Sequence, residues 1–285
     1  MDISITELDD YLKRTESSIR ALRSDCEKKI VWASEPGVKS GTSVVYIHGF
    51  SATRFECSPV IDMVAEKLGA NLFFTRLRGH GQDGRALGEA SFDEFMEDTL
   101  EAIEIGNTIG DEVIVVGCST GCSLIHLTLS QGVSIKSAIY ISPNFGPKSL
   151  MGQSLRLPGA EFFVPLIFGK THSFIPKNSE HTRCWTTSYP TKALFVVRDT
   201  VLAAHQVKHR EITTPMLFWF SDEDKIVNAE WTRRIASKMG INVTLHNPTL
   251  NDQDDPSHHC ILGDILSPSQ TEKGVEKILS WLASC

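Results

Sequence analysis

The chain has 285 residues, of which 41% are hydrophobic and 22% are charged. These values are ordinary for a globular protein and exclude a disordered or fibrous chain. The formal net charge is −7 and lysine and arginine form no dense cluster, so we expect no nucleic acid as a partner. The sequence contains no apolar run of about 18 residues, so we expect no stable insertion into a membrane.

The N-terminus has neither the basic start nor the apolar centre of a secretory signal. The cysteines are odd in number and scattered along the chain: Cys26, Cys57, Cys118, Cys122, Cys184, Cys260 and Cys285. This usage is typical of free thiols in a reducing compartment. We therefore expect a cytoplasmic protein, and the sequence predicts no oligomeric state.

Residues 4–22 have the spacing of a helix, with apolar side chains at Leu8, Leu12, Ile19 and Leu22. The apolar stripe is narrow and its flanks are not basic. A helix that binds a partner or a membrane surface is the alternative, but these features favour a terminal helix that docks on the core. We assign this helix to an N-terminal segment covering residues 1–25.

Short apolar segments then alternate with helical ones. Strands are predicted at residues 29–33, 43–48, 72–75, 112–117, 137–142, 215–221 and 243–246. Helices are predicted at residues 59–68, from 91 to the glycines at 106 and 110, from 120 onward, at 229–239 and at 273–283. Ser91 and Glu94 have the spacing of a capping box. The fold class is therefore α/β, a mostly parallel sheet flanked by helices, and its site should lie at the carboxyl ends of the strands.

Residues 145–214 interrupt this alternation and are rich in proline and aromatic residues. Seventy residues without regular structure are improbable inside a compact domain, so we predict a lid subdomain inserted into a core of residues 1–144 and 215–285. The apolar inner face of the lid is predicted to form a substrate pocket with Phe162, Phe163, Phe168 and Trp185. A few extra helices on one side of the fold are the alternative.

Residues 117–121 read Gly-Cys-Ser-Thr-Gly, between a predicted strand and a predicted helix. This context is that of a nucleophile elbow, a sharp turn that raises a serine hydroxyl above the sheet. Gly117 and Gly121 would let strand and helix pass closely. The pattern predicts Ser119 as the nucleophile.

A serine nucleophile needs a general base and an acid that orients it. His258 and His259 follow the last short strand, and we favour His259 because an apolar run follows it. Three carboxylates follow the strand at 215–221, and we favour Asp224 because Ile226 and Val227 would fix the backbone beyond it. His258 and Asp222 remain the alternatives.

An oxyanion hole needs two backbone N–H groups that face the reacting oxygen. One would belong to Thr120, directly after the nucleophile. The other would belong to Phe50, which follows an apolar strand and Gly49. His48 is expected to be a supporting residue rather than a base, because its place at the strand end suits structural hydrogen bonding.

The chain resembles the α/β-hydrolase superfamily, closest to its carboxylesterase and monoacylglycerol-lipase-like members, in five motifs: His48-Gly49-Phe50, Arg78-Gly79-His80-Gly81, Gly117 to Gly121, Asp224 to Val227, and His259-Cys260-Ile261. The resemblance implies an α/β-hydrolase fold and a serine hydrolase. It also implies Ser119 as nucleophile, His259 as base, Asp224 as orienting acid, and Phe50 and Thr120 as oxyanion donors.

The resemblance further implies a structural role for His80. The chain departs from it at Cys122, where relatives commonly have glycine, so the side chain of Cys122 is expected to crowd the nucleophile and change the acyl pocket. We expect neither Cys118 nor Cys122 to be the nucleophile, because neither stands at the elbow position.

These patterns predict a cytoplasmic esterase that cleaves small carboxylic esters with apolar acyl groups of short to medium length. Thioester, amide or carbon–carbon bond hydrolysis on the same residues is an alternative, as is a ligand-binding protein without catalysis. We expect no cofactor and no metal, because the Asp, His and Cys residues at 254–260 match no common metal-binding spacing. The acidic loop at 252–255 predicts a preference for neutral over anionic esters.

Overall fold

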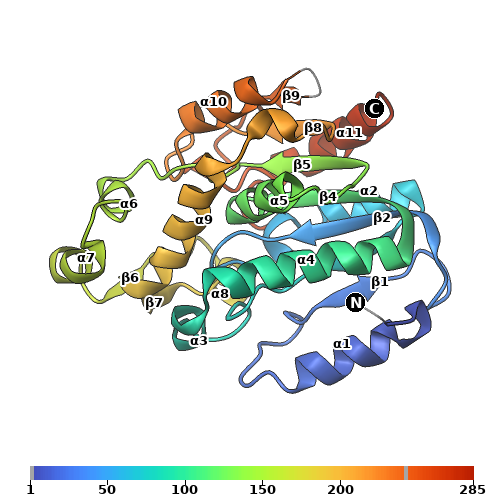
Figure 1. Cartoon of the computed structure of the whole chain (residues 1–285), viewed down its shortest axis with the longest axis horizontal. Coiled ribbons are helices and arrows are strands. Elements are labelled where there is room, and N and C mark those ends of the chain that lie inside the picture. Colours follow the sequence, from blue (N-terminus) through green and yellow to red (C-terminus); the bar gives the residue numbers. More distant parts are fainter. Residues whose placement is uncertain (1–2, 241–242) are drawn as a thin grey trace.

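The computed structural model describes residues 3–240 and 243–285 (Figure 1). Within these residues, one seven-stranded sheet has the order β1-β3-β2-β4-β5-β8-β9. Its strands are β1 (Lys29–Val31), β2 (Ser40–Ile47), β3 (Asn71–Phe74), β4 (Gly110–Cys118), β5 (Ser137–Ile141), β8 (Met216–Trp219) and β9 (Val243–His246). All neighbours pair in parallel except the edge strand β1, which is antiparallel to β3. The predicted α/β class and mostly parallel sheet are confirmed.

The sheet is covered on both faces, which explains why its central strands are apolar throughout. Alternate residues of β2 enter different clusters: Val45 and Ile47 pack on one side, Val44 and Tyr46 on the other. The first side is covered by α1 (Leu8–Ser17), α4 (Phe92–Ile109), α5 (Thr120–Ser130), α9 (Leu194–Gln206) and α10 (Ala229–Met239). The second is covered by α2 (Val60–Leu68) and α11 (Thr271–Leu282). The result is a three-layer sandwich.

Local sequence signals set several helix ends. Ser91 caps α4: its hydroxyl accepts the N–H of Glu94 at 3.3 Å, and the Glu94 carboxylate accepts the N–H of Ser91 at 2.9 Å. Gly69 ends α2 in the left-handed conformation, with φ of 59°. The predicted capping box is confirmed, and the helix boundaries follow from residues that can satisfy the terminal backbone groups.

The N-terminal helix docks on the core, as predicted. A 3₁₀ turn at Ile5–Glu7 leads into α1, and Leu8 and Leu12 are buried in the cluster on the α4 side. The helix is shorter than predicted because it ends at Ser17. Near its end, buried Glu16 accepts two hydrogen bonds from Arg76, at 2.7 and 2.8 Å. This ion pair ties the helix to the loop after β3.

The chain between β5 and β8 contains helices α6 (Leu150–Ser154), α7 (Ala160–Phe168), α8 (Ser179–Cys184) and α9, and the antiparallel pair β6 (Thr171–Ser173) and β7 (Ser188–Pro190). In Figure 1, α6, α7 and this pair lie at one end of the molecule. Helix α9 instead packs on α5 and joins the helix layer. The division into a core and a lid at residues 145–214 stays a prediction.

The remaining elements are α3 (Gly84–Glu89) and the 3₁₀ turns at Arg54–Cys57, Thr191–Ala193, His209–Glu211 and Pro268–Gln270. Over residues 3–240 and 243–285, no helix is both long and apolar enough to span a bilayer. All seven cysteines are free thiols.

Candidate active site

Ser119 occupies a strained turn between β4 and α5. Its φ of 49° and ψ of −112° are rare for a residue with a side chain. A Cβ on Gly121 would lie 2.2 Å from the carbonyl oxygen of Ile47, and one on Gly117 would lie 2.5 Å from Ile125. Both positions therefore require glycine, and the turn presents the Ser119 side chain above the carboxyl ends of the strands.

The structure brings together the three predicted side chains that are far apart in sequence. The Ser119 Oγ lies 3.1 Å from Nε2 of His259, and Nδ1 of His259 lies 2.7 Å from Oδ2 of Asp224. All three residues are buried, with exposed fractions of 6%, 8% and 0%. A hydrogen-bonded chain from carboxylate to hydroxyl is the arrangement that general-base activation of a serine requires.

Asp224 is held in place by the residues that follow it. Its second oxygen, Oδ1, accepts the N–H groups of Ile226 at 2.7 Å and Val227 at 2.9 Å. Asp222 instead pairs at the surface with Arg233, at 2.6 Å. The structure thus places Asp224, and not its alternative, beside the imidazole.

His258, the alternative base, faces away from the serine. Its φ of 57° turns the backbone, and its ring lies 3.4 Å from the hydroxyl of Ser221 and 3.7 Å from the carboxylate of Glu223. The side chains of His258 and His259 therefore have different partners, and of these two histidines only His259 contacts Ser119.

The pKa of His259 is raised above its ordinary value of 6.5. Burial lowers it, but the Asp224 carboxylate and its hydrogen bond outweigh this effect, with smaller contributions from the carboxylates of Glu56 and Asp255. The charged form of the imidazole is thereby stabilised, as a base that accepts a proton during reaction requires.

The acidic loop at 252–255 has a structural role that the sequence analysis missed. Asp255 is 5% exposed, and its carboxylate accepts the N–H groups of His259 at 3.2 Å and Cys260 at 2.9 Å. Asp254 is 4% exposed and accepts the hydroxyl of Ser269 at 2.6 Å. Because these carboxylates are buried and hydrogen-bonded, they position the His259 loop. The preference for neutral over anionic esters stays a prediction.

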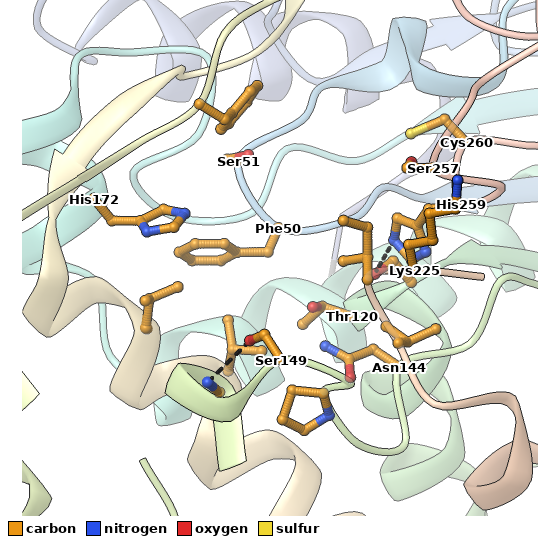
Figure 2. Close-up of a pocket in the computed structure, with 18 of the residues that line it drawn as sticks. Phe50, Ser51, Thr120, Asn144, Ser149, His172, Lys225, Ser257, His259 and Cys260 are labelled. Carbon is orange, nitrogen blue, oxygen red and sulfur yellow. Dashed lines mark hydrogen bonds between the residues drawn. The ribbon is translucent and has the colours of Figure 1, made fainter. Parts of the chain in front are cut away.

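The two predicted oxyanion donors lie beside the serine. Thr120 is the first residue of α5, where backbone N–H groups have no partner inside the helix. Phe50 follows Gly49, at which a Cβ would lie only 3.2 Å from Cβ of Ser119. Figure 2 shows Phe50, Thr120 and His259 around one cavity. The close packing of Gly49 on Ser119 brings the Phe50 backbone to the nucleophile.

His48 and His80 are fully buried supports of this loop. Nε2 of His48 accepts the N–H of Leu77 at 3.1 Å, and Nε2 of His80 accepts the N–H of Ser51 at 2.9 Å. Burial lowers the pKa of His48 to about 4, so its ring is neutral near neutral pH. The structural role expected for both is consistent with these contacts.

Residues 44–262 match the family model described as the alpha/beta hydrolase family. The chain belongs to this family. A search of curated proteins gave no match. The family match confirms the resemblance to α/β-hydrolases that the five sequence motifs indicated.

Several solved structures share the fold of this alpha/beta hydrolase. A structure from work on the metagenome-derived lipolytic enzymes LipS and LipT is 16% identical, with a TM-score of 0.73 over 93% of this chain and 100% of that one. The monoacylglycerol lipase of Paleococcus ferrophilus is 18% identical, with a TM-score of 0.65 over 90% and 98%. A soluble variant of monoglyceride lipase from Saccharomyces cerevisiae is 13% identical, with a TM-score of 0.64 over 90% of each chain.

The alpha/beta hydrolase has a cavity of about 600 Å³ that opens onto Ser119 and His259. Its walls combine the strand-end loops with the segment between β5 and β8. Apolar and aromatic side chains dominate, including Phe50, Leu155, Phe174, Trp185, Tyr189, Val197, Val201 and Ile226. A cavity of this size and character suits a small organic molecule.

Only Trp185 of the four predicted pocket residues lines this cavity. Phe162 is 84% exposed and Phe168 is 42% exposed, and Phe163 packs beside Ala160 and Val164 instead. The prediction was wrong for these three because Ala160 and Val164, one turn apart, form the inward face of α7 and turn its other face to solvent. Val197 and Val201, which do line the cavity, are one turn apart on α9 and so share one face of the helix, a signal that the sequence analysis did not use.

Cys122 does not crowd the nucleophile. Its thiol is fully buried and donates towards the carbonyl oxygens of Gly117 at 3.1 Å and Ile141 at 3.4 Å. Burial raises its pKa well above the ordinary value of 9.0. The side chain therefore packs beneath the elbow, and the expected change of the acyl pocket does not follow from it.

Proposed function

We propose that this alpha/beta hydrolase is a serine hydrolase that cleaves carboxylic esters of small molecules with apolar acyl groups of short to medium length. The observation that carries the proposal is the hydrogen-bonded chain from Asp224 through His259 to Ser119 at the floor of an apolar cavity. The fold that it shares with lipolytic enzymes and monoacylglycerol lipases supports the choice of ester chemistry.

In the first step, the Ser119 oxygen attacks the ester carbonyl carbon and Nε2 of His259 takes the hydroxyl proton. Asp224 holds the ring through Nδ1 and stabilises its positive charge. The N–H groups of Phe50 and Thr120 stabilise the negative oxygen of the tetrahedral intermediate. The intermediate collapses, His259 returns the proton to the alcohol oxygen, and the alcohol leaves an acyl group on Ser119.

In the second step, a water molecule enters the alcohol's place. His259 takes its proton as the water oxygen attacks the acyl carbon, and then returns the proton to Ser119 as the carboxylic acid leaves. The same residues thus serve both half-reactions. The apolar wall formed by Leu155, Val197 and Val201 would accommodate the acyl or alcohol group.

The test is hydrolysis of p-nitrophenyl esters over a series of acyl lengths. The wild type is expected to hydrolyse short and medium esters and Ser119→Ala to lose this activity. Ser130→Ala, a serine at the far end of the same helix, is the control and should keep it. Hydrolysis of thioesters, amides or carbon–carbon bonds without ester cleavage would replace the ester assignment, and binding without turnover would support a non-catalytic protein.

A further inference from the structure

The segment between β5 and β8 holds most of the large apolar side chains that are exposed. Among the described residues, eleven large hydrophobic residues are exposed, and seven of these fall between positions 150 and 175. We call these seven the outer apolar face: Leu150, Leu157, Phe162, Leu166, Ile167, Phe168 and Ile175. Such a concentration on one short segment marks an interaction surface rather than scattered surface residues.

Helix α7 carries the centre of this face. Ala160 and Val164 are buried against Leu155, whereas Phe162 and Leu166 are 84% and 85% exposed. The helix is thus apolar on its inner side and also over most of its outer side, where Glu161 is its single charged residue. A helix that is apolar all round is normally covered on every side. The apolar residues on the exposed side of α7 are therefore of the kind that is normally buried against another surface.

The charge around the face favours an anionic surface. Residues 145–178 contain four exposed basic residues, Lys148, Arg156, Lys170 and Lys177, and one acidic residue, Glu161. The segment thus has a net charge of +3 in a chain whose net charge is −7. Two copies joined face to face would bring like charges together, which disfavours self-association. A lipid surface with anionic headgroups complements both the apolar and the basic residues.

The face also borders the cavity. Arg156, Ile175 and Lys177 line its wall, and Ile175 is at the same time 89% exposed. In Figure 1, α6 and α7 stand at the end of the molecule away from the sheet. Contact through this face would therefore place the cavity wall against the surface that is bound.

We propose that the outer apolar face docks on a lipid surface that carries anionic headgroups. The docking is peripheral, with the side chains of α7 in the interfacial layer and the basic residues at the headgroups. It goes beyond ester hydrolysis and does not depend on it.

The test is flotation of the protein with vesicles of phosphatidylcholine alone or mixed with phosphatidylglycerol. The wild type should bind the mixed vesicles more tightly, and high salt should weaken the binding. The double variant Phe162→Ser/Leu166→Ser should lose at least about tenfold in affinity, since two large apolar side chains would no longer be transferred from water into the lipid interface. The control Val38→Ser/Leu245→Ser removes exposed apolar residues elsewhere and should bind as the wild type does.

Three results would overturn the docking proposal: no vesicle binding by the wild type, equal binding by the α7 variant, or a dimer in solution that the α7 variant abolishes while vesicles stay unbound. Circular dichroism and hydrolysis of a water-soluble ester check that the variant is folded. Neither Phe162 nor Leu166 lines the cavity, so this basal activity should not change.

A separate observation concerns Glu56, a buried carboxyl beside the proposed oxyanion hole. It is 4% exposed, and its Oε2 accepts the N–H of Gly49 at 2.7 Å and the hydroxyl of Tyr46 at 3.1 Å. A Cβ on Gly49 would lie 2.7 Å from Glu56 Oε1 and 3.2 Å from Cβ of Ser119. Gly49 is thus packed between the Glu56 carboxyl on one side and the Ser119 side chain on the other.

The hydrogen bond from the Gly49 N–H to Glu56 fixes the His48–Gly49 peptide, which directly precedes the peptide that carries the Phe50 N–H. On the other side, the N–H of Ser51 is bound to His80 at 2.9 Å. The Phe50 N–H lies between these two anchors. Burying a carboxyl is costly unless its hydrogen bonds are satisfied, so its use here, where an apolar residue would be less costly, points to the N–H that it orients.

We infer that Glu56 is a positioning residue that holds the backbone at Gly49, directly before the Gly49–Phe50 peptide, so that the Phe50 N–H faces the oxyanion. This inference rests on the proposed function. This positioning role affects the rate rather than substrate binding, because the Phe50 N–H interacts fully with the substrate oxygen only in the tetrahedral state.

The test compares Glu56→Ala, Glu56→Asp and Glu56→Gln. Loss of an oxyanion donor typically lowers kcat by about 10²–10³, so we expect a decrease towards this size in the Ala and Asp variants with little change in KM. Glu56→Gln keeps an acceptor for the Gly49 N–H and should restore most of the rate. Trifluoromethyl ketones, which form a tetrahedral oxyanion on serine, should lose affinity in parallel with kcat, whereas the matching methyl ketones should not.

Equal weakening of both ketones, or a fall in stability without a fall in kcat, would contradict the role of Glu56. If Glu56→Ala does not fold, the Asp and Gln variants still decide the question, because both carry a polar side chain and only Gln has the length to reach Gly49. Failure of the proposed function is distinguishable, since the wild type itself would then hydrolyse no ester.

Discussion

Asp224 and His259 are 35 positions apart in the chain, yet Oδ2 of the first lies 2.7 Å from Nδ1 of the second. The other oxygen of Asp224 is occupied by the N–H groups of Ile226 and Val227. The carboxylate therefore has one orientation, which fixes the imidazole ring so that Nε2 faces Ser119.

Replacing Asp224 by asparagine should remove the negative charge that orients and stabilises the His259 ring, while keeping the shape of the side chain. We expect kcat for ester hydrolysis to fall by about 10³–10⁴, because the amide no longer stabilises the imidazolium and favours the wrong tautomer. The measurement is steady-state hydrolysis of a p-nitrophenyl ester. Asp222→Asn, which alters the surface contacts of this carboxylate with Arg233 and Asn247, is the control and should retain near wild-type activity.

The rate should depend on the protonation of His259. Its neutral form is the active base, and its pKa is raised above 6.5 by carboxylates that outweigh burial. The value of kcat/KM should therefore decrease as the pH falls through an inflection above 6.5. Asp224→Asn should move that inflection to lower pH. A wild-type inflection below 6.5 in kcat/KM would contradict the electrostatic account of this site.

Because some of its histidines are buried, the protein should become less stable as the pH falls below 6.5. His126 and His209 contact each other at 2.9 Å, and burial, with the nearby His209 and His205, lowers the pKa of His126 to about 3. In the unfolded chain, His126 binds a proton with its ordinary pKa of 6.5. The stability that comes from burying its neutral ring is therefore fully present above pH 6.5 and is lost as the pH falls towards 3. Between pH 6.5 and about pH 5 the loss from His126 is about 2 kcal/mol. Urea unfolding at several pH values measures it, and His126→Asn should flatten the slope.

Some features of the fold and of the candidate site could be predicted from the sequence, and others could not. The strands, the capping box at Ser91 and the elbow at Ser119 depend on short patterns whose physical causes are local: β-branched apolar runs, a hydroxyl before a helix, and glycines at a tight turn. Asp224 and His259, proposed as the partners of Ser119, could be placed near it because α/β sheets bring strand-end loops together at one edge. Local patterns and topology together were enough for these positions.

Other features depend on tertiary packing that no local pattern records. The aromatic residues of α7 were assigned to the pocket because they are apolar, but whether Phe162 faces in or out depends on which side of the helix meets Leu155. The carboxylates of Glu56 and Asp255 resemble surface residues in the sequence. Only the fold shows that the N–H of Gly49 is bound to Glu56 and the N–H of His259 to Asp255.

The buried pair of Glu16 and Arg76 gives a further prediction. Burial raises the pKa of Glu16, but the hydrogen bonds and charge of Arg76 outweigh this and lower it. Arg76→Gln leaves a buried carboxylate without its cation and should lower the free energy of unfolding by about 3–5 kcal/mol. Urea denaturation measures this change. Glu89→Gln, which breaks the exposed pair with Arg85, should change stability little.

The most direct measurement of the central claim is labelling with a fluorophosphonate, followed by mass spectrometry of the intact protein and of its peptides. If Ser119 is the activated nucleophile, the wild type should gain one adduct, mapped to Ser119, and His259→Ala should react far more slowly. Ser119→Ala should gain none. An unlabelled wild type, or an adduct that persists in Ser119→Ala, would contradict the account.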